Sequence, residues 1–409
     1  MKNIIPYGKQ KIFISDFSEV NKALKSNFIT NGEYVKKFEK SFSKYTKAKY
    51  SITCSSGTAA IDLALKSIGL KKNDNIIIPS VNFIAAANMA KLLGANIFLA
   101  DVDRLSGQMR PSDLLNCIKF NRLKKIKAFF VMYNGGCPNF VKEFYNIKKK
   151  FKTIIIEDAC HALGSKYSIK KNFKIGNCKF SDLATFSFHP LKTITTGEGG
   201  MVTTNNKILN DKLKIYRNHG MIRGKTTKYN YNWAYKIVDA GHNYRLSDLN
   251  CALGYSQLKK INQIIQKRKY IANLYNEELK ELKPIVDFPK VSKDLESAWH
   301  LYVININFKK LKINRKILIQ KLFKNRITTQ VHYIPTFNQP LYKSFYQKNK
   351  FKNAKAFYEN CLSLPIYYDL NSKTVKNIAK KLKNIIHQSK HIIYYKLEFD
   401  IGISLPAFP

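Results

Sequence analysis

The chain has 409 residues, and its hydrophobic content of 45%, with charged residues spread throughout, excludes a disordered polypeptide. This length exceeds that at which a single core usually stops growing, so we expect one large and one smaller domain. The 71 lysines and arginines against 27 acidic residues give a formal net charge of +44. Because the lysines are scattered along the whole chain, the charge indicates a general compositional bias rather than a nucleic-acid-binding surface, although its field would attract an anionic substrate.

The cysteines and the N-terminus indicate an intracellular protein. Seven cysteines are spread widely and form no Cys-x-x-Cys pair, which is typical of reduced thiols and not of a zinc site or a disulfide framework. The first nine residues lack the apolar segment of a signal peptide. The most apolar region, residues 76–100, is interrupted by Pro79, Asn82, Asn88 and Lys91. We therefore predict a cytoplasmic protein with no membrane-spanning helix and no metal site.

From about Tyr50 to Thr204, short β-rich runs alternate with helical patterns. We predict strands at residues 75–79, 97–101, 128–133, 153–158, 184–188 and 201–204. This alternation indicates an α/β fold with a mostly parallel central sheet flanked by helices. Ligands of such sheets bind beyond the carboxyl ends of the strands.

The second half of the chain has a different pattern. A helical pattern runs from Leu246 to about Leu282, and Pro284 and Pro289 follow it. We then predict a strand at 301–308, a helix at 315–324, a loop at 331–340 and a basic helix at 374–387. The expected organisation is an N-terminal arm (1–20), a large domain (21–260), a smaller C-terminal α+β domain (261–390) and a tail without an assigned role (391–409).

One lysine and one aspartate suggest the chemistry. Lys192 lies in the stretch FSFHPLKTITTGEGG (186–200), and Asp158 ends the predicted strand at 153–158. A lysine can hold pyridoxal phosphate as a Schiff base, and a carboxylate can keep the pyridine nitrogen protonated so that the ring accepts electrons. Alternatively, Asp158 would only cap a following helix. We favour the cofactor role, with Lys192 as the catalytic base.

Small and hydroxyl residues precede the helical pattern at 61–70. Ser55, Ser56, Gly57 and Thr58 would place free backbone amides at a helix N-terminus, where a phosphate group can bind. Taken alone, this pattern is an ordinary helix cap. The hydroxyl of Ser187 would complete the phosphate contacts, or else be a buried hydroxyl bonded to backbone.

Two aromatic residues are further candidates for contact with the cofactor ring. His161 follows Asp158 closely and would lie against the ring or its phenolic oxygen; the alternative is a satisfied core histidine. Phe83 would stack on the other face of the ring; the alternative is plain core packing.

Five segments together, at residues 56–58, 157–164, 186–200, 217–220 and 241–246, resemble the sugar-nucleotide aminotransferases of fold type I, and the match runs from about Tyr7 to about His387. This resemblance implies a homodimer with active sites at the subunit interface, in which Asn243 reaches the partner's cofactor phosphate or substrate. A dehydratase branch of the family has histidine in place of the lysine. Because this chain keeps Lys192, the resemblance implies transamination, with glutamate as the expected amino donor.

The segments QVHYIP (330–335) and QPLY (339–342) are similar to those of the pseudaminic acid pathway enzymes, which aminate a UDP-4-keto-6-deoxy-N-acetyl-L-hexosamine. The resemblance implies that the substrate contacts are Tyr7, Asn27, Phe28, Ile29, Thr30, Ser56, Asn243, His332, Tyr333, Ile334 and Pro335. One alternative is a related transaminase acting at C3, on a dTDP-linked sugar or on a 4-keto-arabinose. Another is a non-catalytic basic protein of the same fold that binds nucleic acid or has a regulatory role.

Overall fold

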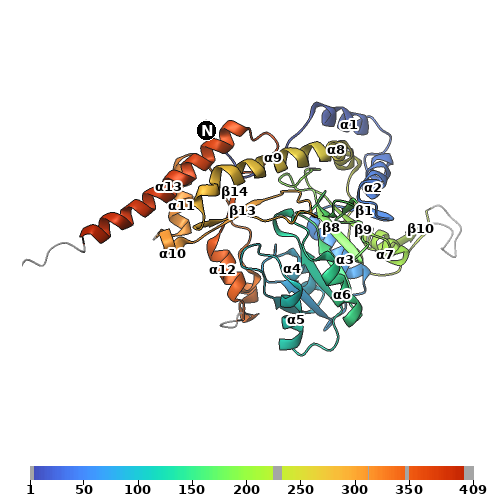
Figure 1. Ribbon diagram of the computed structural model, residues 1–409. Coiled ribbons are helices and arrows are strands. Elements are labelled where there is room, and N and C mark those ends of the chain that lie inside the picture. Colours follow the sequence, from blue (N-terminus) through green and yellow to red (C-terminus); the bar gives the residue numbers. More distant parts are fainter. Residues whose placement is uncertain (1–3, 224–232, 312, 346–349, 400–409) are drawn as a thin grey trace, which may run out of the picture.

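The computed structural model describes residues 4–223, 233–311, 313–345 and 350–399, with side chains described as far as Ser389. Its centre is a seven-stranded sheet in the order β1-β9-β8-β5-β4-β2-β3 (Figure 1). The strands are β1 (Tyr50–Cys54), β2 (Asn75–Pro79), β3 (Asn96–Ala100), β4 (Ala128–Met132), β5 (Ile154–Asp158), β8 (Leu183–Ser187) and β9 (Gly200–Thr204). Only β9 runs antiparallel to its neighbours. The mostly parallel sheet is therefore confirmed, and six of its strands agree with the predicted ones to within one residue at each end.

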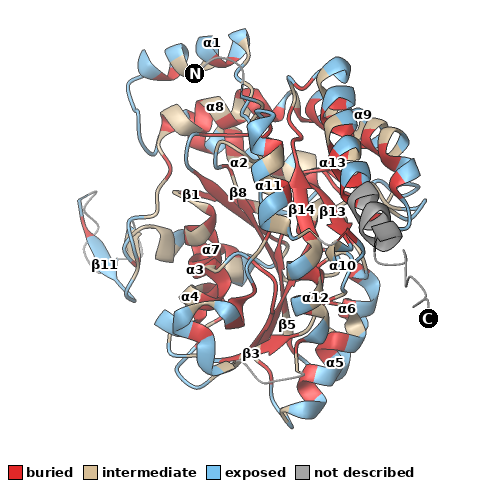
Figure 2. Ribbon diagram, turned by 90° about the vertical axis from the view of Figure 1, so that its left-hand side faces the viewer, coloured by how far each residue is buried: buried red, intermediate tan, exposed pale blue. Residues whose placement is uncertain are grey.

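Helices cover both faces of this sheet, as the buried strands of Figure 2 show. Ile77, Phe129 and Ile155 contribute to one core, whereas Ile76 and Phe130 contribute to the other, because successive side chains of a strand point to opposite faces. The covering helices are α2 (Glu33–Thr46), α5 (Pro111–Phe120), α6 (Val141–Phe151) and α8 (Asp248–Leu258) on the first core and α3 (Gly57–Ser67), α4 (Ala85–Leu92) and α7 (Lys207–Arg217) on the second. This is the layered architecture expected when strands are buried on both faces.

The C-terminal part forms a third core around a small antiparallel sheet of β12 (Val286–Asp287), β13 (Tyr302–Ile306) and β14 (Cys361–Leu364). The helices of this part are α9 (Ile261–Leu279), α10 (Phe308–Leu311), α11 (Arg315–Lys324), α12 (Lys352–Asn360) and α13 (Ser372–Phe399); the buried residues of α12 belong to the second core. The predicted strand at 301–308 and helix at 315–324 are thus present. The remaining elements are α1 (Ile14–Leu24), the hairpins β6 (Lys166–Ser168) with β7 (Phe173–Lys174) and β10 (Met221–Arg223) with β11 (Tyr235–Ile237), and 3-10 turns at Asn134–Gly136, Lys280–Leu282, Thr336–Asn338 and Pro340–Phe345.

The helical pattern predicted from Leu246 to Leu282 is two helices, α8 and α9, and not one. The predicted domain division at residues 260–261 falls between them. It stays a prediction, because α9 contributes Ile261 and Ile265 to the first core and Ile271 and later residues to the third.

The structure differs from the predicted N-terminal arm and C-terminal tail at both ends of the chain. Residues 14–20 of the predicted arm belong to α1, and the amide of Ile5 donates to the carbonyl of Arg326 in the C-terminal part. The helix predicted at 374–387 lies within α13, which continues to Phe399 and extends away from the rest of the molecule (Figure 1). Part of the predicted tail is therefore helical, and residues 400–409 lie outside the described residues. No helix among the described residues is long and apolar enough to cross a membrane.

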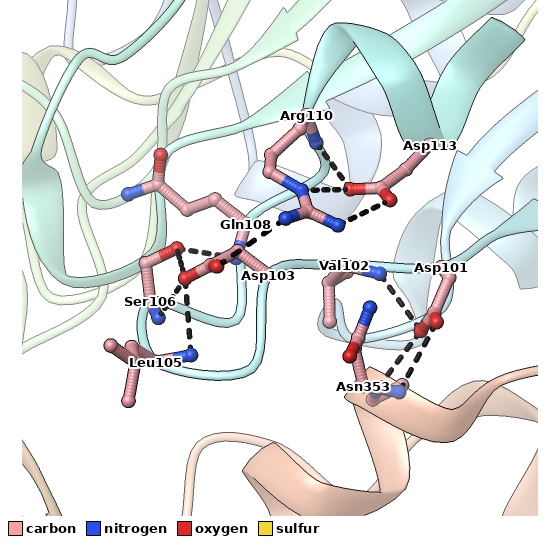
Figure 3. A network of polar contacts seen from close by, with 10 residues as sticks. Asp101, Val102, Asp103, Leu105, Ser106, Gln108, Arg110, Asp113 and Asn353 are labelled. Carbon is pink, nitrogen blue, oxygen red and sulfur yellow. Dashed lines mark hydrogen bonds and ion pairs between the residues drawn. The ribbon is translucent and has the colours of Figure 1, made fainter.

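A polar network ties the large sheet to the C-terminal part (Figure 3). The carboxylate of Asp101, after β3, accepts hydrogen bonds from the amides of Asn353 (3.2 Å) and Ala354 (2.9 Å) in the first turn of α12. Arg110 nearby forms a two-bond ion pair with Asp113 that fixes the start of α5. Asp101 thus caps a helix that is distant in sequence.

Candidate active site

A cavity of about 600 Å³ lies beyond the carboxyl ends of β4, β5 and β8, against the segment 330–334 of the C-terminal part. Such a position is where ligands bind in sheets of this type. The structure brings most of the predicted site residues to this cavity, namely Tyr7, Ser56, Gly57, Thr58, Phe83, Asp158, His161, Ser187, Lys192, His332, Tyr333 and Ile334. Segments more than 300 residues apart in sequence therefore meet at one site.

Helix α3 and the end of β8 make close contact at the cavity. The helix begins at Gly57, four residues before the predicted pattern, and its N-cap Ser56 accepts a hydrogen bond from the Ala59 amide (3.0 Å). A Cβ on Gly57 would lie only 2.7 Å from the Cβ of Ser187, so a larger residue would not fit without a shift. The first amides of a helix have no partner within the helix. This geometry fits a bound phosphate group.

Asp158 and Lys192 also line the cavity. Asp158 is 4% exposed at the end of β5, and its Oδ1 accepts from the amide of Cys160 (3.3 Å). No helix follows it before β6, so the alternative of a helix-capping aspartate is wrong. Burial lowers the pKa of the Lys192 amino group below its ordinary value, whereas Cys160 and Asp158 act in the opposite direction. A lowered pKa favours the neutral amine, which is the nucleophilic form.

His161, His300, His332 and Tyr333 line the same cavity. His161 is 2% exposed; its Nε2 lies 2.8 Å from the hydroxyl of Tyr333, while its Nδ1 has no partner. It is therefore not a fully satisfied core histidine. Burial lowers the pKa of His161 well below its ordinary value, with Lys192 and His332 acting in the same direction. His332, whose Nδ1 lies 2.8 Å from the hydroxyl of Ser363, has its pKa lowered to about 4, chiefly by burial.

Phe83 is 55% exposed and lies at the cavity, with its ring centroid 5.9 Å from that of Tyr333. This exposure contradicts the alternative in which Phe83 is part of the core. Its ring is available to contact a ligand.

Several predicted substrate contacts do not line the cavity of this chain. Residues 27–30 are exposed and join α8, where the Ile29 carbonyl accepts from the Asp248 amide. Asn243 is also exposed and pairs with Asn218. Pro335 is buried before the turn at Thr336–Asn338. Contact of Asn243 and residues 27–30 with a partner's site stays a prediction.

Sequence reasoning missed some residues of the cavity. Asn82 is 2% exposed, and neither polar atom of its amide has a partner. Its place just beyond the carboxyl end of β2 was the signal that could have revealed it. Cys160 and His300 also line the cavity. Among the described residues, no group of three or more His, Cys, Asp or Glu side chains could hold a metal ion.

The donor set fits pyridoxal phosphate: a lysine of lowered pKa, a buried aspartate, a histidine with an unpartnered ring nitrogen, and a helix start that a Cβ would obstruct. Together with the mostly parallel sheet, these residues define a pyridoxal phosphate-dependent enzyme of fold type I.

Comparison with known proteins identifies the group of enzymes within this class. The chain belongs to the DegT/DnrJ/EryC1/StrS aminotransferase family, whose model matches residues 11–383. A UDP-4-amino-4,6-dideoxy-N-acetyl-beta-L-altrosamine transaminase of Campylobacter jejuni is 35% identical over 387 residues, which cover 95% of this chain and 99% of the relative. The spore coat polysaccharide biosynthesis protein SpsC of Bacillus subtilis is 31% identical, with 94% of this chain and 97% of the relative covered.

Solved structures agree with this assignment. PseC of Helicobacter pylori, an aminotransferase involved in pseudaminic acid biosynthesis, superposes with a TM-score of 0.85 at 30% identity, covering 94% of this chain and 100% of that one. The PLP form of Spr1654 of Streptococcus pneumoniae, described as a sugar aminotransferase, gives 0.84 at 25% identity, covering 95% and 100%. The predictions of fold type I, of a transaminase and of pyridoxal phosphate as its cofactor are confirmed: the protein is a sugar aminotransferase.

Proposed function

We propose that this enzyme transfers an amino group from glutamate to C4 of a UDP-4-keto-6-deoxy-N-acetyl-L-hexosamine, as part of pseudaminic acid biosynthesis. The observation that carries this proposal is the meeting of Lys192 and Asp158 with the segment 330–334 in one cavity. The similarity to the Campylobacter jejuni transaminase, which extends over 95% of this chain, supports the choice of substrate.

Several residues that line the cavity would hold the cofactor. Pyridoxal phosphate, when bound, supplies an electron sink for the carbon that carries the transferred amino group. Asp158 would hold its ring nitrogen, and Lys192 would attach to its reactive carbon. The amides at the start of α3 and the hydroxyl of Ser187 would hold its phosphate, and His161 would contact its ring.

Lys192 moves the protons of the reaction. With the cofactor bound, the neutral amine of Lys192 would accept a proton from the α-carbon of glutamate, and in the second half-reaction it would deliver a proton to C4 of the sugar. Burial makes this base more available by lowering the pKa of Lys192. His332 is neutral at pH 7, so it orients a polar group of the sugar by hydrogen bonding without adding charge.

Further parts of the substrate site would come from a second subunit. We propose a homodimer in which Asn243 and residues 27–30 of one protomer complete the site of the other. These residues are exposed and are not among those that line the cavity of their own chain, which supports this arrangement.

Absorbance spectroscopy of the purified enzyme tests the proposal. We expect a visible band from the lysine-bound cofactor that disappears with glutamate and returns with the UDP-linked 4-keto sugar. Return of the band only with a C3-keto, dTDP-linked or 4-keto-arabinose substrate would replace the proposed substrate by that one. Salt-dependent nucleic-acid binding without any band would instead indicate the non-catalytic alternative.

Replacement of Lys192 tests its role as the base, and replacement of a distant lysine is the matched control. Lys192→Ala should remove the band and lower turnover at least about a thousandfold, because the base is lost. A Lys192→Ala enzyme with wild-type turnover would contradict the assignment of the base. Replacement of a distant exposed lysine, Lys376→Ala on α13, should leave both readouts unchanged.

A further inference from the structure

A third buried histidine, His300, lies at the cavity although none of the recognised motifs contains it. Its side chain is 6% exposed, and its Nδ1 has no partner. The centroid of its ring lies 4.3 Å from that of His161, with 43° between the ring planes. Rings at this distance are in contact, so the ring of His300 limits the positions that the ring of His161 can adopt.

The backbone before His300 is strained. Trp299 has φ of 50°, in the left-handed region that bulky residues rarely adopt, and its amide donates to the hydroxyl of Ser297 (3.1 Å). At this turn, His300 and Trp299 line different cavities. His300 lines the active-site cavity, whereas Trp299 lines a second cavity of about 290 Å³. The conformation of Trp299 therefore decides where the ring of His300 points.

A buried arginine holds this turn from α9. Arg268 is 3% exposed, and its NH1 donates to the carbonyls of Trp299 and His300 (both 3.2 Å) and of Ile366 (3.1 Å). No carboxylate of the described chain lies within ion-pair distance of it. A buried cation is costly unless hydrogen bonds compensate for lost hydration. Because two of its three acceptors belong to the strained turn, Arg268 stabilises that turn.

We propose that Arg268 and His300 are positioning residues of the active site: Arg268 fixes the turn at residues 297–301, and His300 in turn holds the ring of His161 in the orientation that meets the cofactor. Both act through His161, which has its own hydrogen bond to Tyr333. The orientation of His161 towards the cofactor rests on the cofactor contact given in the proposed function. The contacts among Arg268, His300 and His161 exist without it.

The first test uses His300→Ala and His300→Phe in the full-length protein. In cofactor-free protein labelled with 15N-histidine, His300→Ala should shift or broaden the ring-nitrogen resonances of His161, assigned with a His161→Gln variant. In the loaded enzyme, the glutamate half-reaction should slow about tenfold. His300→Phe restores a ring of similar size, so it should keep the His161 resonances near their wild-type positions and the rate within about twofold of wild type.

A second pair of variants covers the case in which His300→Ala does not fold. Arg268→Lys keeps a cation but lacks the planar guanidinium, so it should change the His161 resonances and slow the half-reaction about threefold. His387→Phe, at an exposed histidine of α13, is the matched control and should change neither. Folding of each variant is checked by thermal unfolding.

The outcomes separate this proposal from the proposed function. A folded His300→Ala or Arg268→Lys protein with unchanged His161 resonances and unchanged half-reaction rate would overturn it. A variant with lowered thermal stability but unaltered resonances would show a merely structural role and would overturn it equally. Absence of the visible band in the loaded wild-type enzyme would contradict the proposed function, while the resonances of the cofactor-free protein would still decide whether His300 positions His161.

Discussion

Gly57 begins α3 where an added Cβ would lie 2.7 Å from the Cβ of Ser187. We expect Gly57→Ala to push α3 and the end of β8 apart and to raise the dissociation constant of pyridoxal phosphate at least about tenfold, a loss of about 1.4 kcal/mol. Fluorescence titration of the cofactor-free protein measures this constant. An affinity of Gly57→Ala equal to that of wild type would contradict the predicted phosphate site.

His332 makes stability depend on pH. An unfolded histidine titrates near pH 6.5, whereas burial lowers the pKa of His332 to about 4 in the folded protein. Between these values the unfolded state binds more protons, so stability is full above pH 6.5 and is lost as the pH falls towards 4. Between pH 7 and pH 5 the free energy of unfolding should decrease in both proteins. We expect the decrease in His332→Gln to be about 2 kcal/mol smaller than in wild type.

Urea denaturation at the two pH values measures this difference. The pKa values of His161 and His300 are also lowered by burial, so part of the pH-dependent loss should remain in the variant. His387→Gln, at an exposed position, should behave as wild type does. The same loss in His332→Gln as in wild type would show that His332 titrates normally in the folded protein.

Sequence patterns predicted the residues whose chemistry is unusual within a local motif, such as Lys192, Asp158 and Gly57. They missed His300 and Asn82. His300 meets His161 only because α9 and the turn at residues 297–301 fold against the large sheet, and no local pattern encodes a contact across about 140 residues. The roles of the individual site residues stay predictions until ligands are bound.

At the scale of elements, the six predicted strands were recognisable because each is a short apolar run, as expected for strands buried on both faces. β1 was not predicted, since its sequence YSITC contains polar residues; Ser51 and Thr53 use their side chains to bond α2 through Glu39. The split between α8 and α9 was also missed, because Lys259 and Lys260 have good helix propensity and carry no breaking signal.

Replacement of Asp101 tests how the large sheet and the C-terminal part are joined. Its carboxylate accepts from the amides of Asn353 and Ala354 at the start of α12. Asp101→Ala should therefore lower the free energy of unfolding by about 1 kcal/mol, as for the loss of a helix cap. Urea denaturation measures the change. Glu277→Ala removes an exposed ion pair with Lys280 and should cost less than about 0.5 kcal/mol, so equal effects of both variants would argue against the cap.

For the whole molecule, the net charge of +44 should influence how fast an anionic substrate arrives. We expect kcat/KM for the UDP-linked sugar to fall several-fold between low and high ionic strength, because salt screens the attraction. Steady-state kinetics with added sodium chloride measure this decrease. A 4-keto sugar without its nucleotide should show little salt dependence; if both substrates respond equally, the charge acts on the protein rather than on substrate capture.

Helix α9 limits how the large sheet and the C-terminal part can move relative to each other. It is one continuous helix of 19 residues whose first turn packs in a core of the large sheet and whose last turns pack in the C-terminal core. A hinge between these cores would have to bend or unwind the helix beside Arg268, the residue that holds the turn before His300. We therefore expect the two parts to behave as one rigid body during turnover, so that substrate enters and leaves through rearrangement of side chains and loops at the cavity mouth.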